Sequence, residues 1–107
     1  MEEQKRITHR RIGGATMYNK KYILEKIEEF NGHNDIYDDI QGSVCYLAYF
    51  NVGERGWFLQ ETGFDMVHRI HTSIVKGVTY YQNVELSSDY IAVETNNTKL
   101  IFREVKD

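Results

Sequence analysis

The sequence predicts an α+β fold in which one N-terminal amphipathic helix packs on a five- to six-stranded antiparallel sheet, or on a small SH3-like or Sm-like barrel. Three observations lead to this expectation. Aromatic residues make up 13% of the chain and include eight tyrosines, a composition that favours strands. Apolar residues between positions 20 and 30 recur at helical spacing. Residues 89–105 have the pattern of two strands joined by a two-residue turn.

The predicted helix covers residues 20–30, and Gly32 follows it as a C-terminal stop. Lysines open the segment and glutamates close it, which is the reverse of what the helix dipole favours. A helix this short is also marginal alone, so we expect it to be held by docking on the sheet. The apolar stripe that would dock comprises Ile23, Leu24, Ile27 and Phe30.

The middle of the chain predicts three or four strands after a polar loop. The loop covers residues 31–42 and has room for one helical turn. Residues 43–50 are apolar on both faces, as in a central strand that is covered on both sides. Turn residues at 51–56 separate this strand from a second one at 57–61. Residues 67–82 hold one or two further strands, with a bulge or bend expected at Gly77.

The C-terminal hairpin is the most strongly specified element. Asn96-Asn97 is a two-residue loop suited to positive φ, and a loop of that length fixes the register of the flanking strands. One face then pairs apolar residues, and the other holds an ion pair and a cation–π pair. The expected pairs are Val93 with Leu100, Ile91 with Phe102, Glu94 with Lys99, and Tyr90 with Arg103.

Length and composition indicate one domain, at residues 13–107, preceded by a basic and flexible arm or short edge strand at residues 1–12. The first 24 residues carry six basic against two acidic side chains, whereas residues 25–39 carry one against six. Cys45 is the single cysteine, so no internal disulfide can form. No apolar run is long enough for a membrane span or a signal peptide. We therefore expect a cytoplasmic protein without membrane contact.

No group of residues predicts catalysis, a metal site or a cofactor. His68 and His71 would point to opposite faces of a strand, which does not suit a shared metal ion. Cys45 lies in an apolar strand, where a buried small hydrophobe is expected rather than a nucleophile. One acidic loop offers oxygen ligands but fits no calcium-loop pattern, so a solvated loop is the favoured interpretation. That loop contains His33, Asp35, Asp38 and Asp39.

The surplus of tyrosine, together with arginine and histidine on predicted strands, indicates a recognition surface. Exposed loop charges beside aromatic side chains often contact partners, and ordinary strand propensity explains part of the tyrosine content. The residues that we expect to contact a partner or ligand are Arg55, Trp57, Arg69, His71, Tyr90, Asn97 and Arg103.

Three segments carry a resemblance to a group of proteins: RGWFL at 55–59, HRIHTSIV at 68–75 and VETNNT at 93–98. In these segments, which lie within about half of the chain, the sequence resembles small uncharacterised accessory proteins carried by phages and mobile elements of Gram-positive bacteria. The resemblance implies action without catalysis, either by binding and blocking a host defence protein or by sequestering a nucleotide signal.

The leading hypothesis is a non-catalytic binding protein, an inhibitor or adaptor that acts on another protein through a β surface rich in Tyr, Arg and His. One alternative is a protein that sequesters a small anionic, nucleotide-like ligand. Another is a small nucleic-acid-binding barrel that uses the basic arm, although the net charge of −3 disfavours it. A homo-oligomer is compatible with each hypothesis.

Overall fold

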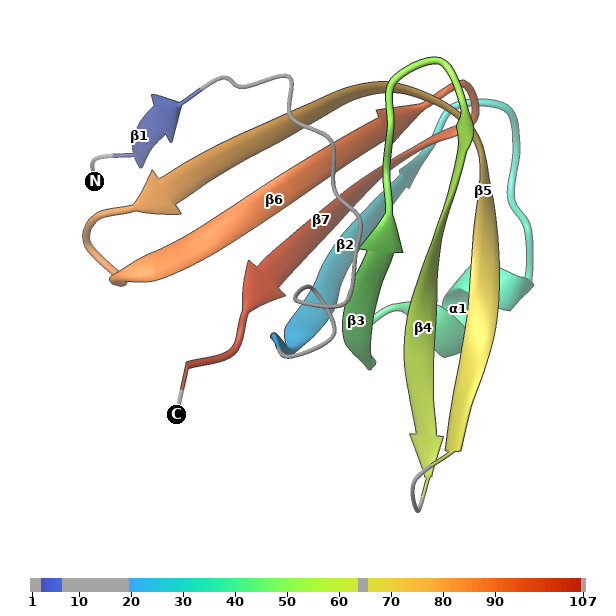
Figure 1. The fold of residues 1–107 in the computed structure, drawn as a ribbon, viewed down its shortest axis with the longest axis horizontal. Coiled ribbons are helices and arrows are strands. Elements are labelled where there is room, and N and C mark those ends of the chain that lie inside the picture. The colour runs from blue at the N-terminus through green and yellow to red at the C-terminus, as the bar shows by residue number, and fades with distance from the viewer. Residues whose placement is uncertain (1–2, 7–19, 64–65, 107) are drawn as a thin grey trace.

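The structure is a computed structural model that describes residues 3–6, 20–63 and 66–106. Strands dominate these residues, and one short helix interrupts them (Figure 1). The elements are β1 (Glu3–Arg6), β2 (Tyr22–Glu29), α1 (Ile36–Ile40), β3 (Val44–Tyr49), β4 (Arg55–Gly63), β5 (Met66–Asn83), β6 (Ser88–Thr95) and β7 (Thr98–Glu104).

Six of the strands close into a ring. Each strand from β2 to β6 pairs antiparallel with the next one along the chain, and β7 returns to pair with β2. β1 stands outside the ring and pairs with the last residues of β5 (Figure 1). Of the arm predicted at residues 1–12, residues 3–6 form this edge strand, and the rest lies outside the described residues.

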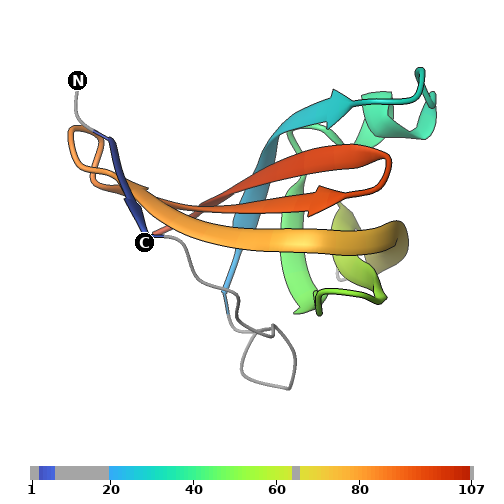
Figure 2. The same cartoon turned by 90° about the horizontal axis from the view of Figure 1, so that it is seen from above.

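β5 joins the two halves of the ring because it bends along its length. Its first half pairs with β4, and its second half pairs with β6 and β1. The pairing with β6 shifts between Val75 and Gly77, so Lys76 is an extra, bulged residue. The bulge predicted at Gly77 is confirmed, and Figure 2 shows β5 curving without a break from one side of the molecule to the other.

The interior of the ring is filled by side chains that alternate inward from every strand. Phe50, Phe58 and Phe102 meet at its centre, with ring centroids 5.3–6.4 Å apart. Ile40 of α1 also joins this core. The other large, fully buried side chains are Leu24, Leu47, Leu100, Val75, Val78, Val93 and Thr95.

The predicted α+β fold with an N-terminal amphipathic helix is wrong, because residues 22–29 form β2. A bulge between Leu24 and Lys26 explains the misleading spacing. Leu24 lies opposite Phe102 and Ile27 opposite Leu100, so both face inward although they are three residues apart. Phe30, which would complete a helical stripe, is 48% exposed. The helical turn expected within residues 31–42 is confirmed as α1.

The remaining strand predictions are confirmed with small changes at their ends. In the C-terminal hairpin all four predicted pairs are Cα partners, from Glu94 with Lys99 to Tyr90 with Arg103. The expected positive φ in the Asn96-Asn97 turn is wrong, and within the described residues Glu94 and Lys99 form no ion pair. Residues 67–82 form one strand rather than two. Among the described residues, no helix has the length and apolar character needed to cross a membrane.

Candidate functional site

The predicted contact residues of β4 and β5 gather on the outer surface of the ring. Strand alternation sends Gly56, Phe58 and Gln60 inward, so the residues between them point outward. β3 and the first half of β5 flank β4 and add their own outward side chains. We call this surface the aromatic face, and it comprises Tyr46, Tyr49, Trp57, Leu59, Glu61, Arg69 and His71.

Four side chains at the centre of the aromatic face form a two-by-two grid. Trp57 lies opposite His71, and Leu59 lies opposite Arg69. The guanidinium carbon of Arg69 lies 4.3 Å from the centroid of the Trp57 ring, which is cation–π geometry. Arg69 and His71 are exposed, while Trp57 and Leu59 are half-buried. Trp57 and Leu59 therefore form an apolar surface, and the charged guanidinium of Arg69 lies over the Trp57 ring.

The two tyrosines on β3 hold carboxylates at the edges of this face. Tyr46 donates a hydrogen bond from its hydroxyl to Oε2 of Glu61, 2.7 Å away. This bond raises the pKa of Tyr46, because it favours the protonated phenol. Tyr49 donates to Oε2 of Glu54 at 2.8 Å, and Asn51 donates to the same oxygen. The rims of the aromatic face are thus held in place by hydrogen bonds.

Arg55 lies beside the aromatic face, where β4 begins. Its side chain is exposed, and its Nε donates to the carbonyl oxygen of Thr72 at 3.0 Å. At the other end of the β4–β5 hairpin, Met66 and Val67 are 64% and 53% exposed. Apolar side chains thus extend the surface toward the end of the hairpin.

The other three predicted contact residues lie elsewhere on the ring. Tyr90 and Arg103 are partners on β6 and β7, where Tyr90 is buried and stacks on Tyr81 with ring centroids 5.1 Å apart. Arg103 pairs with Glu25 of β2, with 2.6 Å between Nε and Oε2.

Asn97, in the β6–β7 turn, joins three segments of the chain. Its side-chain oxygen accepts from Nδ2 of Asn31 at 2.8 Å, and its carbonyl oxygen accepts from the backbone of Phe30. Its backbone N–H faces Ser73 Oγ at 3.3 Å and Thr95 Oγ1 at 3.2 Å. The seven predicted residues therefore do not form one surface.

Sequence reasoning did not single out Tyr46, Tyr49, Leu59 or Glu61 as contact residues. The apolar run at 43–50 indicated a strand covered on both sides, but in β3 Tyr46 and Tyr49 are only half-buried. The available signal was the presence of two tyrosines in the run, because a tyrosine ring suits a surface of intermediate exposure. Tyr46 and Tyr49 are three residues apart, and only the bulge between Leu47 and Tyr49 lets both point outward from one strand.

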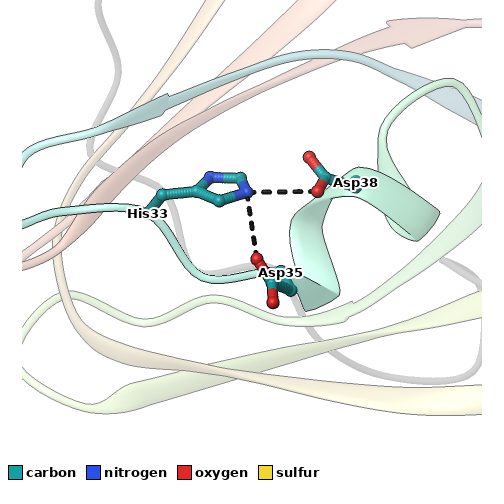
Figure 3. Close-up of side chains that lie close together, drawn as sticks. All are labelled: His33, Asp35 and Asp38. Carbon is teal, nitrogen blue, oxygen red and sulfur yellow. Dashed lines mark hydrogen bonds and ion pairs between the residues drawn. The ribbon is translucent and has the colours of Figure 1, made fainter.

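A second group of charged side chains links β2 to α1 through His33, which contacts Glu29 on one side. Figure 3 shows its other contacts, with Asp35 and Asp38. Nδ1 of His33 lies 2.6 Å from Oε2 of Glu29, and Nε2 lies 3.1 Å from Oδ2 of Asp38. Asp35 is 3.5 Å from the same Nε2. The hydrogen bond with Glu29, and then that with Asp38, raise the pKa of His33 to about 9. The imidazole is therefore protonated at neutral pH and donates from both nitrogens.

Ligand-type atoms of His33, Asp35 and Asp38 lie within 4.8 Å of one another, close enough for one cation to reach all three. All three side chains are exposed. A metal ion would first have to displace the Nε2 proton that the carboxylates stabilise. We therefore describe the group as an ion-pair cluster, here called the His33 cluster, in which the imidazolium already supplies the positive charge.

Cys45 is fully buried in β3, as the sequence predicts. Burial raises the pKa of its thiol to about 12, so the thiol stays protonated at neutral pH. Its Sγ points to the carbonyl oxygen of Ser43 at 3.6 Å. Cys45 therefore behaves as a core residue.

Comparison of the chain with protein-family models, with curated proteins and with solved structures finds no match.

Proposed function

We propose that the chain is a non-catalytic binding protein, an inhibitor or adaptor that acts on another protein through the aromatic face. The observation that carries the proposal is the grid of Trp57, Leu59, Arg69 and His71 on paired strands. Tryptophan, tyrosine and arginine are the residues that contribute most to binding energy at protein interfaces.

The rigidity of the surface supports this role. Trp57 and Leu59 stand on β4, which pairs with β3 on one side and β5 on the other, so little backbone order has to be gained there on binding. Arg69 and His71 stand on the first half of β5, which within the described residues pairs only with β4. Arg69 is already stacked on Trp57, which reduces the rotamer entropy that the arginine would lose at an interface. A preformed surface of this kind suits a folded partner.

The interior of the ring gives less support to the alternative of a sequestered small ligand. A ligand trap needs a cavity that encloses its ligand. In the described residues the centre of the ring is occupied by Phe50, Phe58 and Phe102. A ring of six strands is also narrower than the eight-stranded barrels that enclose one small ligand. The outer surface is thus the better candidate for binding.

Charge argues against the alternative of a nucleic-acid partner. Affinity for nucleic acid depends on several basic side chains that neutralise phosphates together. The chain carries a net charge of −3, and Glu54 and Glu61 border the aromatic face. A protein partner fits this balance better.

The test is affinity capture from cells that produce the chain, with the aromatic face altered by Trp57→Ala and Arg69→Ala together. The matched control is Glu94→Ala with Lys99→Ala, a cross-strand pair on the β6–β7 hairpin. We expect the same protein to be captured by the wild type and the control and to be lost with the altered face. Far-UV circular dichroism checks that each variant is folded. Capture that is unchanged by the aromatic-face variant, or absent with the wild type, contradicts the proposal.

A further inference from the structure

We infer that Arg69, Trp57 and His71 form a carboxylate-recognition element, so that the partner presents an acidic side chain beside an apolar one. The inference rests on the proposed function, because it assigns a chemistry to the partner that binds the aromatic face. The proposed occupant is an acidic protein segment, because its negative charge complements the positive charge of Arg69.

Arg69 carries a positive charge that the described part of the chain does not neutralise. Every ion pair found there involves other residues, and the contact that the structure gives Arg69 is the stack on Trp57. Glu61 lies on the same face but engages the hydroxyl of Tyr46. An exposed guanidinium without a carboxylate is thus left open to an external anion.

The contact with Trp57 also holds the guanidinium on the aromatic face. Its carbon lies over the Trp57 ring, and no side-chain hydrogen bond within the described residues occupies its N–H groups, whose planar fork matches the two oxygens of a carboxylate. The apolar surface shields one side of the resulting ion pair from water. That shielding strengthens the attraction relative to a fully solvated pair.

His71 provides a second donor on the same side of the strand. It stands two residues from Arg69, a rise of about 7 Å along an extended chain, and it lies opposite Trp57. An imidazole offers an N–H whether it is neutral or protonated. Arg69 and His71 therefore flank the indole, and an acidic side chain can reach both while its apolar neighbour contacts Trp57 and Leu59.

A single carboxylate fits this element better than a polyanion does. The aromatic face holds one arginine; at its edges stand Glu61 and Glu54, and Arg55, whose Nε is bonded to the carbonyl oxygen of Thr72. These carboxylates would repel a chain of phosphates, which needs several cations in a row. One acidic side chain can bind at Arg69 and avoid both.

The chain contains its own reporter, because Trp57 is its single tryptophan. The experiment is a fluorescence titration of the full chain with two capped dodecapeptides that differ only in Glu versus Gln at alternate positions, with Leu and Ser between them. We expect a saturable change with the Glu peptide and an affinity at least about tenfold weaker with the Gln peptide, since a hydrogen bond to a charged group is stronger than one to a neutral amide.

Three variants assign the effect to the named residues. Arg69→Gln should weaken binding of the Glu peptide at least about tenfold, and Arg69→Lys should weaken it as well, because Lys lacks the planar fork. Lys99→Gln, on the β6–β7 hairpin, is the matched control and should bind as the wild type does. Equal affinity for the two peptides, no response to the Glu peptide, or normal binding by Arg69→Gln overturns the inference.

Two further arms separate the possible outcomes. A twelve-residue oligothymidine that binds more tightly than the Glu peptide, and loses affinity in Arg69→Gln, overturns the inference in favour of a nucleic acid. If the partner captured by affinity is lost with the double aromatic-face variant but retained by Arg69→Gln, the proposed function stands and the carboxylate inference fails. Loss with both variants, together with the Glu-peptide preference, supports both proposals.

Discussion

At the scale of single residues, Gly56 shows how closely the interior of the ring is packed. A Cβ atom at this position would lie 2.4 Å from one ring carbon of Phe50 and 2.9 Å from the carbonyl oxygen of Tyr49. Phe50 cannot retreat easily, because its ring packs against Phe58 and Phe102. The absence of a side chain at position 56 therefore allows the β3–β4 turn to close over the core.

The substitution Gly56→Ala should destabilise the protein by about 1–3 kcal/mol, the usual cost of overpacking a filled core. Urea unfolding followed by circular dichroism measures the change. Gly77→Ala is the matched control, because a Cβ there meets nothing within 4 Å, and it should shift stability by no more than about 0.5 kcal/mol. Equal losses for the two variants would show that Phe50 moves aside without penalty.

At the scale of elements, the pairing between β2 and β3 is the shortest strand pairing in the ring. The two strands pair directly only at Tyr22 with Cys45 and at Ile23 with Val44. Beyond that point the side chain of Gln41, the residue after α1, accepts a hydrogen bond from the backbone of Ile27 in β2. The His33 cluster then joins the end of β2 to α1.

The His33 cluster predicts a dependence of stability on pH. The pKa of His33 is about 9 in the folded protein and about 6.5 in an unfolded chain, so folding strengthens proton binding. Its stabilising contribution is fully present below pH 6.5 and is lost as the pH rises through 9. The wild type should therefore exceed His33→Gln in urea midpoint at pH 6, and the difference should shrink by pH 10.

Asp39→Asn provides the control for this titration. Asp39 lies on α1, and its backbone oxygen accepts hydrogen bonds from Ser43 and Gln60, so replacing its side chain should keep the pH dependence of the wild type. A direct measurement is the NMR titration of the His33 ring. A midpoint near 6.5 would show that protonation of His33 does not stabilise the folded protein. A difference in urea midpoint between wild type and His33→Gln that stays constant from pH 6 to 10 would show the same.

At the scale of the whole molecule, closure of the ring depends on strands from opposite ends of the described chain. β2 and β7 pair along most of their length, from Tyr22 with Glu104 to Glu29 with Thr98. Leu24 and Phe102 meet in this pairing and lie in the core. β1 has no such role, because it pairs only with the second half of β5.

Truncation distinguishes the two roles. Removal of residues 1–6 should leave a cooperative urea transition, since every pair within the ring is retained. Removal of residues 98–107 should abolish the transition, because it removes Leu100 and Phe102 from the core and exposes the edges of β2 and β6. Fluorescence of Trp57 follows both experiments. A cooperative transition in the second truncation would mean that the ring is stable when open.

The sequence by itself determined the elements whose signals are local. The hairpin register followed from a two-residue turn between alternating strands, and the bend in β5 followed from a glycine within a strand. Burial of Cys45 followed from its apolar neighbours. In each case residues that are close along the chain fix the geometry, so no knowledge of distant partners was needed.

Only the tertiary structure decided the state of residues 22–29 and the composition of the aromatic face. The spacing of Leu24 and Ile27 suits either a helix or a bulged strand, and pairing with β7, some eighty residues away, selects the strand. The predicted contact residues divide between two regions for the same reason. Which strands become neighbours depends on closure of the ring, a non-local event that buries the apolar side of every strand at once.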